Sequence, residues 1–325
     1  MATPSLAMIP SGYKDGTLYS VLPNNAGGDF NVTRGSLATR VNSNGLIEPV
    51  GTLGADVVLN GDFEETGADQ VLNGDFAQEG SEEITNGDFA TDSNWTKGTG
   101  WTISGGTANC DGTQTSSTAM VQETVTNSNA NVKVSFTISG YVSGLIKVRN
   151  SGGFSGTYVS GNGTYVFYVN TGVATNIVLD ADASFVGSVD NVSVVEVGQN
   201  WSLGDKWSII DNAARLVSAD SAASTLSQDN VFTVGKNYKI TLDAVVVSGI
   251  AKISGLGGTF IESIDETKTY SIYWVADTTT LTFNRQSTIS DITITNITAE
   301  EVGQEWSLTD GVSITAQGAR ITSDG

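Results

Sequence analysis

The sequence contains internal repeats of two lengths, and these constrain its fold more than any other feature. The tetrapeptide Asn-Gly-Asp-Phe begins three times, with a spacing of 13 residues, at Asn60, Asn73 and Asn86. A unit of about 105 residues follows, and each start of it carries tryptophan: Trp95 with Trp101, Trp201 with Trp207, and finally Trp306. Tandem duplication without catalytic variety indicates a structural or binding protein.

The long unit is a series of strand-like blocks. The matched pairs of blocks are 132–136 with 238–242, 142–148 with 247–253, 165–168 with 270–273, 191–193 with 296–298, and 196–198 with 301–303. Apolar and polar residues alternate within the blocks, and Gly-rich turns separate them, which is typical of β-strands. About 100 residues of such strands is the size of one β-sandwich. No helical segment of useful length separates the strands, so a parallel α/β fold is not expected.

Composition supports an all-β protein and limits its partners. The 325 residues carry a formal net charge of −20 and are rich in Gly, Ser, Thr and Asn, with Val and Ile prominent among the apolar residues. Phosphate backbones require Lys and Arg, so neither nucleic acid nor an anionic membrane is an expected partner. No apolar run reaches about 18 residues, so no membrane insertion is expected. Residues 1–10 lack the features of a secretory signal.

The chain lacks the residues of the commonest catalytic machineries. It has no histidine, and Cys110 is its single cysteine, which excludes Ser-His-Asp and Cys-His catalysis and an intrachain disulfide. Cys110 is expected to be a small buried residue. The adjacent acids Glu64–Glu65, Glu82–Glu83 and Glu300–Glu301 are expected to face water and not to flank a substrate as glycosidase carboxylates do. The sequence therefore predicts a protein that is not an enzyme and needs no cofactor.

Changes in composition divide the chain into five parts. All four prolines lie within the first fifty residues, and no basic residue occurs between Glu48 and Lys97. We predict an N-terminal segment, an acidic neck, two β-sandwiches and the start of a third repeat, with the bounds 1–50, 51–83, 84–198, 199–303 and 304–325. Two strands cannot close a sandwich, so the natural chain is expected to continue.

The three short copies allow three interpretations. In the first, each is a tight turn whose phenylalanine, at Phe63, Phe76 or Phe89, faces a core. In the second, only the copy at Asn86 enters a sandwich, and the other two form a stalk. In the third, the carboxylates of Asp62, Asp75 and Asp88 bind a cation such as calcium.

Aromatic residues provide the candidate glycan contacts. The tryptophans that recur at fixed strand positions are expected to lie in the cores, although an aromatic face can also stack on a sugar ring. Trp274 differs, because the first long unit has Val169 at the matching position. Trp274, with Tyr270 and Tyr273 beside it, is therefore the preferred candidate for a glycan contact.

Residues 29–48 read DFNVTRGSLATRVNSNGLIE. This stretch resembles the N-terminal signature of tailed-bacteriophage fibre and appendage proteins. The resemblance covers about the first fifty residues and implies a segment that docks the fibre to the virion, with Arg34, Ser36, Thr39, Arg40, Asn42 and Gly45 as its signature positions. The Pro-Arg-Leu-Asp-Tyr stretch that usually follows in that family is absent here.

Residues 84–198 resemble a second family, the jelly rolls similar to carbohydrate-binding modules. The resemblance rests on Asn86 to Phe89 at the start and Asp190 to Val194 at the end. It implies that the first and last strands are neighbours, and that Asp88 and Asp190 are candidates for a structural calcium site. The copy at 199–303 lacks the Asn-Gly-Asp-Phe opening, so calcium is not expected there.

These observations predict a structural fibre or appendage protein of a tailed bacteriophage, located in the virion and assembled in the host cytoplasm. Its expected partners are capsid or tail proteins at the N-terminus and glycans or a host surface at the sandwiches. The resemblance also implies a homotrimer. Two alternatives are a bacterial extracellular glycan-binding adhesin and the non-catalytic N-terminal part of a tail-spike depolymerase.

Overall fold

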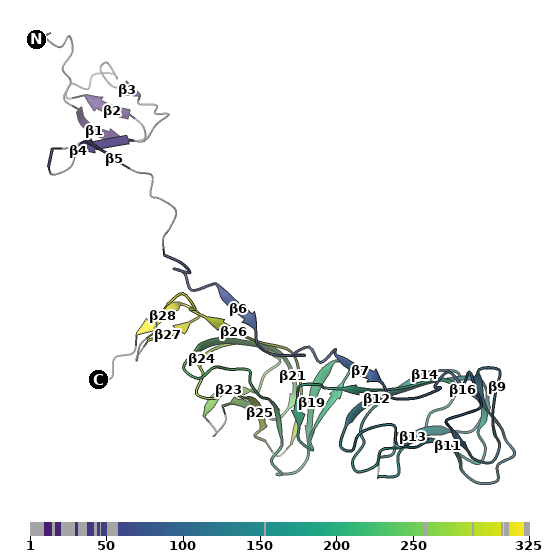
Figure 1. The fold of residues 1–325 in the computed structure, drawn as a ribbon. Helices are drawn as coiled ribbons and strands as arrows, with labels where there is room; N and C mark the ends of the chain where they lie inside the picture. The colour runs from purple at the N-terminus through teal and green to yellow at the C-terminus, as the bar shows by residue number, and fades with distance from the viewer. Residues whose placement is uncertain are drawn as a thin grey trace, which may run out of the picture. The chain divides into compact units, whose positions relative to one another are not determined.

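The computed structural model confirms the all-β fold with tandem sandwiches. It describes residues 58–321 except 153, 256–258, 288, 307 and 309–311, and nearer the N-terminus residues 10–14, 17–20, 30–31, 38–41, 44–45 and 47–50. These residues form strands and turns (Figure 1). Among them there is no helix long and apolar enough to cross a membrane. The chain divides into two compact units, residues 1–61 and 62–325.

The N-terminal unit contains two small antiparallel sheets. One consists of β1 (Pro10–Lys14), β2 (Thr17–Ser20) and β3 (Phe30–Asn31), and the other of β4 (Ala38–Val41) and β5 (Ile47–Val50). Gly45 lies between β4 and β5 with a φ of 76°, which favours glycine. Asn44 and Gly45 thus lie in the turn of an antiparallel hairpin formed by β4 and β5.

The first sandwich packs a six-stranded sheet on a four-stranded one. The larger sheet has the order β14-β12-β16-β10-β9, with β7 also paired to β16, and the smaller one has the order β13-β15-β11-β8. The strand bounds are β7 (Glu79–Glu82), β8 (Thr96–Lys97), β9 (Trp101–Ser104), β10 (Thr107–Asp111), β11 (Thr118–Gln122), β12 (Asn131–Ser143), β13 (Ile146–Arg149), β14 (Gly163–Asn170), β15 (Ile177–Ala181) and β16 (Val186–Val197).

The second sandwich repeats this plan with one added strand. Its sheets have the orders β18-β19-β26-β21-β24, with β6 also paired to β26, and β17-β20-β25-β22-β23. The strand bounds are β6 (Thr66–Asp69), β17 (Ser202–Leu203), β18 (Trp207–Ile210), β19 (Ala213–Ser218), β20 (Thr225–Gln228), β21 (Asn237–Ser248), β22 (Ala251–Ser254), β23 (Phe260–Ile264), β24 (Lys268–Val275), β25 (Leu281–Arg285) and β26 (Ser290–Val302). The start of the third repeat forms a hairpin of β27 (Val312–Thr315) and β28 (Gly318–Ile321).

The cores are formed by the inward residues of these alternating strands. Each sandwich has one buried cluster, with the fully buried Phe136 and Phe185 in the first and Phe283 in the second. The recurring tryptophans of both complete units belong to these clusters, as expected: Trp95, Trp101, Trp201 and Trp207. Cys110 is also buried, and burial is the main cause that raises the pKa of its thiol.

The short copies enter the sandwiches in reverse order. The third copy supplies Phe89 to the first core, where its ring packs on Trp95 with centroids 5.4 Å apart. The second copy supplies Phe76 to the second core, where its ring packs on Trp201 at 5.2 Å. Both phenylalanines are 1% exposed. The first of the three interpretations is thus confirmed for these two copies, and the stalk interpretation is wrong for the second copy.

The tetrapeptide forms the same turn wherever it enters a core. The amide of Phe89 donates to the carbonyl of Asn86 at 3.2 Å, and the equivalent bond from Phe76 to Asn73 is 3.1 Å. Asn86 and Phe89 have left-handed backbones, with φ of 56° and 49°. A phenylalanine rarely accepts this conformation, so burial of its ring must outweigh the strain.

Each turn is seated on a bulge in the last strand of its sandwich. Asn191 in β16 and Asn296 in β26 have φ of 51° and 53°, and the strand pairing shifts next to both residues. The amide of Val192 then donates to the Gly87 carbonyl at 2.9 Å, and that of Ile297 donates to the Gly74 carbonyl at 3.0 Å. The first and last strands of each sandwich are therefore neighbours, as the jelly-roll resemblance implied.

A buried glutamine also binds the chain just before the second and the third short copy. Gln122 accepts a hydrogen bond from the Thr85 amide at 2.9 Å and donates one to the Thr85 carbonyl at 2.8 Å. Gln228 makes the same pair of bonds with Leu72, both at 2.8 Å. The side chain thus replaces the backbone of a neighbouring strand at the edge of the smaller sheet.

We expect Gln122→Ala to destabilise the first sandwich by about 1–2 kcal/mol, since it removes two hydrogen bonds that each contribute roughly 1 kcal/mol. Gln228→Ala should have the same effect on the second sandwich. Hydrogen exchange of the peptides that contain Thr85 and Leu72 measures both effects. Each variant serves as the control for the other, and a variant that affects both sandwiches equally would contradict this local role.

The boundaries predicted for the neck and the first two sandwiches need correction. Within the predicted neck of 51–83, β6 and Phe76 belong to the second sandwich and β7 to the first. The second sandwich therefore does have an Asn-Gly-Asp-Phe opening, placed before the whole of the first sandwich in the sequence. The chain starts the second sandwich, builds the first one, and then returns to complete the second.

Candidate functional site

The predicted docking residues belong to the N-terminal unit. Thr39 and Arg40 lie in β4, where they pair with Pro49 and Glu48 of β5, and Gly45 lies in the intervening turn. Arg34, Ser36 and Asn42 lie outside the described residues. Half of the signature thus belongs to one hairpin, and a docking role for it remains a prediction.

The three glycan candidates share β24 but not one face of it. Tyr270 is 4% exposed, and its hydroxyl accepts the amides of Asp265 and Glu266, both at 3.1 Å. Trp274 is partly buried, and its ring meets that of Phe232 edge-on, with centroids 5.0 Å apart. Because side chains alternate along a strand, Tyr273 points to the opposite face. The structure therefore does not bring these rings together as one stacking platform.

Tyr273 lies instead where the second sandwich meets the third repeat. It lines a hollow together with Lys239, Phe63 and residues 315–318. The matching residue in the first sandwich is Tyr168, which packs against the second core. Tyr168 also hydrogen-bonds with Asp211, and its pKa is raised chiefly by burial. Both tyrosines are thus junction residues, a role that their shared position in the long repeat could have suggested.

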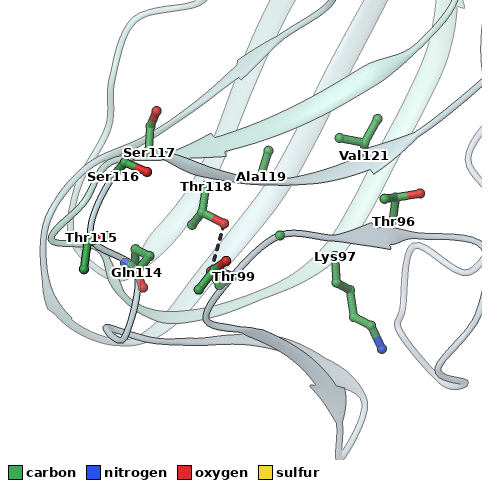
Figure 2. Close-up of a pocket in the computed structure, with 11 residues that line it drawn as sticks. Thr96, Lys97, Thr99, Gln114, Thr115, Ser116, Ser117, Thr118, Ala119 and Val121 are labelled. Atoms are coloured by element: carbon green, nitrogen blue, oxygen red, sulfur yellow. Dashed lines mark hydrogen bonds between the residues drawn. The ribbon is translucent and has the colours of Figure 1, made fainter.

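A polar pocket lies beside the edge strand β8 in the first sandwich (Figure 2). It has a volume of about 390 Å³, and most of its lining residues carry hydroxyl groups: Thr96, Thr99, Thr115, Ser116, Ser117 and Thr118. Thr118 donates its hydroxyl proton to the Thr99 carbonyl at 2.8 Å, as the dashed line shows. Lys97, on its rim, is paired with Asp92. The lining contains neither an aromatic ring nor a carboxylate, so it offers hydrogen bonds but no stacking face or acid pair.

The candidate calcium ligands take part in turns. Asp88 accepts the amide of Ala90 at 3.3 Å, and Asp62 and Asp75 accept the corresponding amides of Glu64 and Ala77. Asp190 accepts the amide of Asn191 at 2.6 Å. Among the described residues, no three His, Cys, Asp or Glu side chains form a group that could hold a metal. The repeated turn bonds explain these aspartates, and calcium binding by Asp88 and Asp190 remains a prediction.

Chelation distinguishes a role of these aspartates in their turns from the calcium binding that the jelly-roll resemblance implies. The Asp88 carboxylate already stabilises its own turn. We therefore expect EDTA to leave the melting temperature of the first sandwich unchanged within about 1 °C. A loss of 1 kcal/mol in stability would lower the melting temperature of a domain of this size by about 4–8 °C. Differential scanning calorimetry with and without 1 mM added calcium provides the measurement. A rise of several degrees with calcium, lost in Asp190→Asn, would contradict the turn-only role.

Among the described residues, the second sandwich contains three aspartates with a lowered pKa, whereas the first contains one, Asp111, which accepts hydrogen bonds from Thr113. Arg215 holds Asp291 through two bonds, Nε to Oδ1 at 3.0 Å and Nη2 to Oδ2 at 2.9 Å. Asn109, the counterpart of Arg215 in the first sandwich, accepts a neutral bond from Ser188. Hydrogen bonding from Arg215 lowers the pKa of Asp291, bonds from Asn296 and Thr269 lower the pKa of Asp243, and one from Lys206 lowers that of Asp220.

We therefore expect the second sandwich to lose more stability in acid than the first. An aspartate whose pKa is lower in the folded state than its ordinary value of about 3.9 stabilises the fold at any pH above 3.9. This stabilisation is lost as the pH falls from about 3.9 through the lowered pKa. Melting of both sandwiches between pH 6 and 3, followed by hydrogen exchange, measures the difference. Asp291→Asn should remove part of this difference in acid sensitivity, at most about 1 kcal/mol for a surface pair. Equal acid sensitivity of both sandwiches would contradict the prediction.

Comparisons with known proteins add little to this geometry. No family model and no curated protein sequence matches the chain. Among solved structures, allantoicase from Saccharomyces cerevisiae is similar over 57% of this chain and 77% of its own, with 8% identity and a TM-score of 0.25. A structure of BuGH86wt in complex with neoagarooctaose matches 60% of this chain and 33% of its own, with 8% identity and a TM-score of 0.20. Scores this low carry no functional conclusion.

Proposed function

We propose that this chain is a structural fibre or appendage protein of a tailed bacteriophage. Its N-terminal unit docks to the capsid or the tail, and its tandem sandwiches project from the particle. The observation that carries the proposal is the signature over residues 29–48. The division of the chain after residue 61 supports it, because a docking element separate from the projecting part is what a fibre requires.

The tandem sandwiches suit a binding role in which similar surfaces are presented repeatedly along one chain. Duplicated sandwiches in a homotrimer would present several copies of each surface, and multivalency converts weak contacts into useful avidity. Glycans or a host surface are the proposed ligands. The hydroxyl-lined pocket near Thr118 offers hydrogen bonds to sugar hydroxyls, whereas the packed faces of Tyr270 and Trp274 are less suitable.

The test is to locate the protein on purified particles. A gold-labelled antibody against the second sandwich should mark the virion by electron microscopy, and mass spectrometry should find the chain at a fixed ratio to the major capsid protein. Absence from purified particles would refute the proposal. Secretion by a bacterium would favour the adhesin alternative, and a catalytic domain in the same polypeptide would favour the depolymerase.

The docking role has its own variant. Arg34→Ala combined with Arg40→Ala should abolish incorporation into particles while both sandwiches keep their melting temperatures. Lys14→Ala, in β1 and outside the signature, is the matched control and should be incorporated normally. Normal incorporation of the double variant would place the docking surface elsewhere.

A further inference from the structure

The two sandwiches are nested in the sequence, because the residues of the first lie between the two parts of the second. Two junctions of the same kind join the repeats. At the first junction, β14 lies beside β18 of the second sandwich, and at the second junction, β24 lies beside β27 of the third repeat (Figure 1). Each junction contains a lysine and a tyrosine that lie opposite each other in neighbouring strands: Lys133 with Tyr168, and Lys239 with Tyr273. The two junctions can therefore be compared residue by residue.

At the first junction, carboxylates hold both of these side chains. Lys133 forms an ion pair with Glu79 of β7 at 2.6 Å, and Tyr168 hydrogen-bonds with Asp211 in the turn between β18 and β19. The charge of Asp211 also acts on Lys133. Tyr168 packs against the second core as well. The ammonium group and the ring are thus both used in joining the two sandwiches.

The second junction lacks both carboxylates. Thr66 of β6 takes the place of Glu79, since each of them pairs with the equivalent valine of the last strand. The two-residue turn between β27 and β28 has Ala316 at the place of Asp211. The lysine and the tyrosine are the same as at the first junction, but the acids that would hold them are absent from these two positions.

The lysine and the tyrosine of the second junction line a hollow. Among the described residues, the Lys239 ammonium and the Tyr273 hydroxyl have no hydrogen-bond or ion-pair partner. The hollow has a volume of about 410 Å³, within the usual range of about 300–1,000 Å³ for small-molecule sites. Tyr273 is half-buried, and so is Phe63, which also lines the hollow. The hollow thus offers aromatic surface, one ammonium group and room for a small ligand.

The charges around the hollow favour an uncharged ligand. The ammonium of Lys239 repels a cation. The carboxylates of Asp62 and Glu64 line the hollow, and Glu300 lies opposite Lys239 in β26, so an anion is repelled as well. The same groups donate and accept hydrogen bonds, and Gln317 in the lining can do both. A neutral ligand with several hydroxyl groups satisfies these donors and acceptors, and an apolar ring face can pack on the tyrosine.

We propose that this hollow binds a neutral pyranose ring, which packs on Tyr273 and hydrogen-bonds with Lys239 and with the carboxylates of the lining. The first junction does not form such a site, because its lysine and tyrosine are already held by acids. The inference rests on the proposed glycan-binding role but not on a location in the virion, so sugar binding and incorporation into particles can fail separately.

Nuclear magnetic resonance of the isotope-labelled 325-residue chain tests the site. The neutral probes are the methyl glycosides of glucose, galactose and mannose together with N-acetylglucosamine, and glucuronic acid is the acidic probe. A neutral probe should shift the backbone amides of residues 62–66 and 315–318 and those of Lys239 and Tyr273, with a Kd of about 1–10 mM. No shift with any neutral probe at about 50 mM, shifts confined to other residues, or a preference for glucuronic acid would overturn the proposal.

Four variants make the test specific. Tyr273→Ala should raise the Kd at least about tenfold, whereas Tyr273→Phe keeps the ring and should leave the Kd within about threefold. Thr66→Glu gives Lys239 an acidic partner of the kind found at the first junction, and it should raise the Kd at least about fivefold while both sandwiches keep their melting temperatures. Tyr168→Phe, at the first junction, is the matched control and should bind normally. Binding that survives Tyr273→Ala or Thr66→Glu, or that Tyr168→Phe weakens equally, would disprove the site.

Discussion

Replacement of Gly87 by alanine is expected to destabilise the first sandwich by about 3 kcal/mol or more. A Cβ at this position would lie 2.0 Å from the carbonyl oxygen of Val192 and 2.9 Å from Cγ2 of Ile84. The backbone oxygen belongs to the last strand and cannot retreat without breaking the hydrogen bond from the Val192 amide to Gly87. Space, and not backbone conformation, is what requires glycine here.

The three copies provide matched controls for this prediction. Gly74→Ala should destabilise the second sandwich to the same extent, because its Cβ would lie 2.0 Å from the Ile297 oxygen. Gly61→Ala should cost under about 1 kcal/mol, since its nearest neighbour is the Val58 side chain at 3.2 Å, which can shift. Hydrogen exchange resolved by sandwich is the appropriate measurement, because a chain with several domains does not unfold in one step. Equal effects of all three variants would contradict the nested assignment.

Phe89→Ala is expected to cost the first sandwich about 3–5 kcal/mol, the usual range for removing a buried phenylalanine. Its ring is 1% exposed and packs against Trp95. Alanine would leave a cavity beneath the turn and would keep the left-handed backbone, whose φ is 49°, without the ring burial that offsets its strain. Phe76→Ala should have the same effect on the second sandwich, although Phe76 precedes the first sandwich in the sequence.

Phe63→Ala is the matched control. Phe63 is only partly buried, against the exposed Trp306, so its replacement should cost about 1 kcal/mol and should leave both complete sandwiches intact. Denaturant titration followed by sandwich-specific hydrogen exchange distinguishes the three variants. If Phe76→Ala weakened the first sandwich instead of the second, the reverse order of the copies would be wrong.

Local sequence pattern was sufficient for most of the fold. Alternation predicted the strands of both sandwiches, because a strand with one buried face must alternate. The matched blocks 132–136 and 238–242 indeed occupy equivalent strands, β12 and β21. The burial of Trp95 and Trp201 also followed from their repetition at fixed strand positions.

The assignment of the short copies could not be made from local pattern. The three copies are identical over four residues, so each local sequence fits every position equally well. Their partners lie far along the chain, as the bond from the Ala299 amide to Asp69, across 230 residues, illustrates. One signal was available, since three phenylalanine turns match three tryptophan starts in number.

The candidate binding residues show a different limit of the sequence. Tyr270 and Tyr273 were grouped because they are close in sequence, but strand alternation separates them. Residues 270, 272 and 274 lie on the face of β24 that is turned toward the core. Tyr273 therefore lies on the opposite face. The roles of Gln122 and Gln228 were missed, although their separation of 106 residues is that of the repeat.

Nesting also determines how the molecule would bear mechanical force. Thr66 and Val302 lie opposite each other at one end of the β6–β26 pair, so tension between Asp62 and Ile321 pulls on that end and opens the hydrogen bonds one after another. While this pair holds, the force passes directly from β6 to β26 and bypasses residues 79–197. The first sandwich therefore carries no load until the second has yielded, so a pulled chain would lengthen in a fixed sequence of steps.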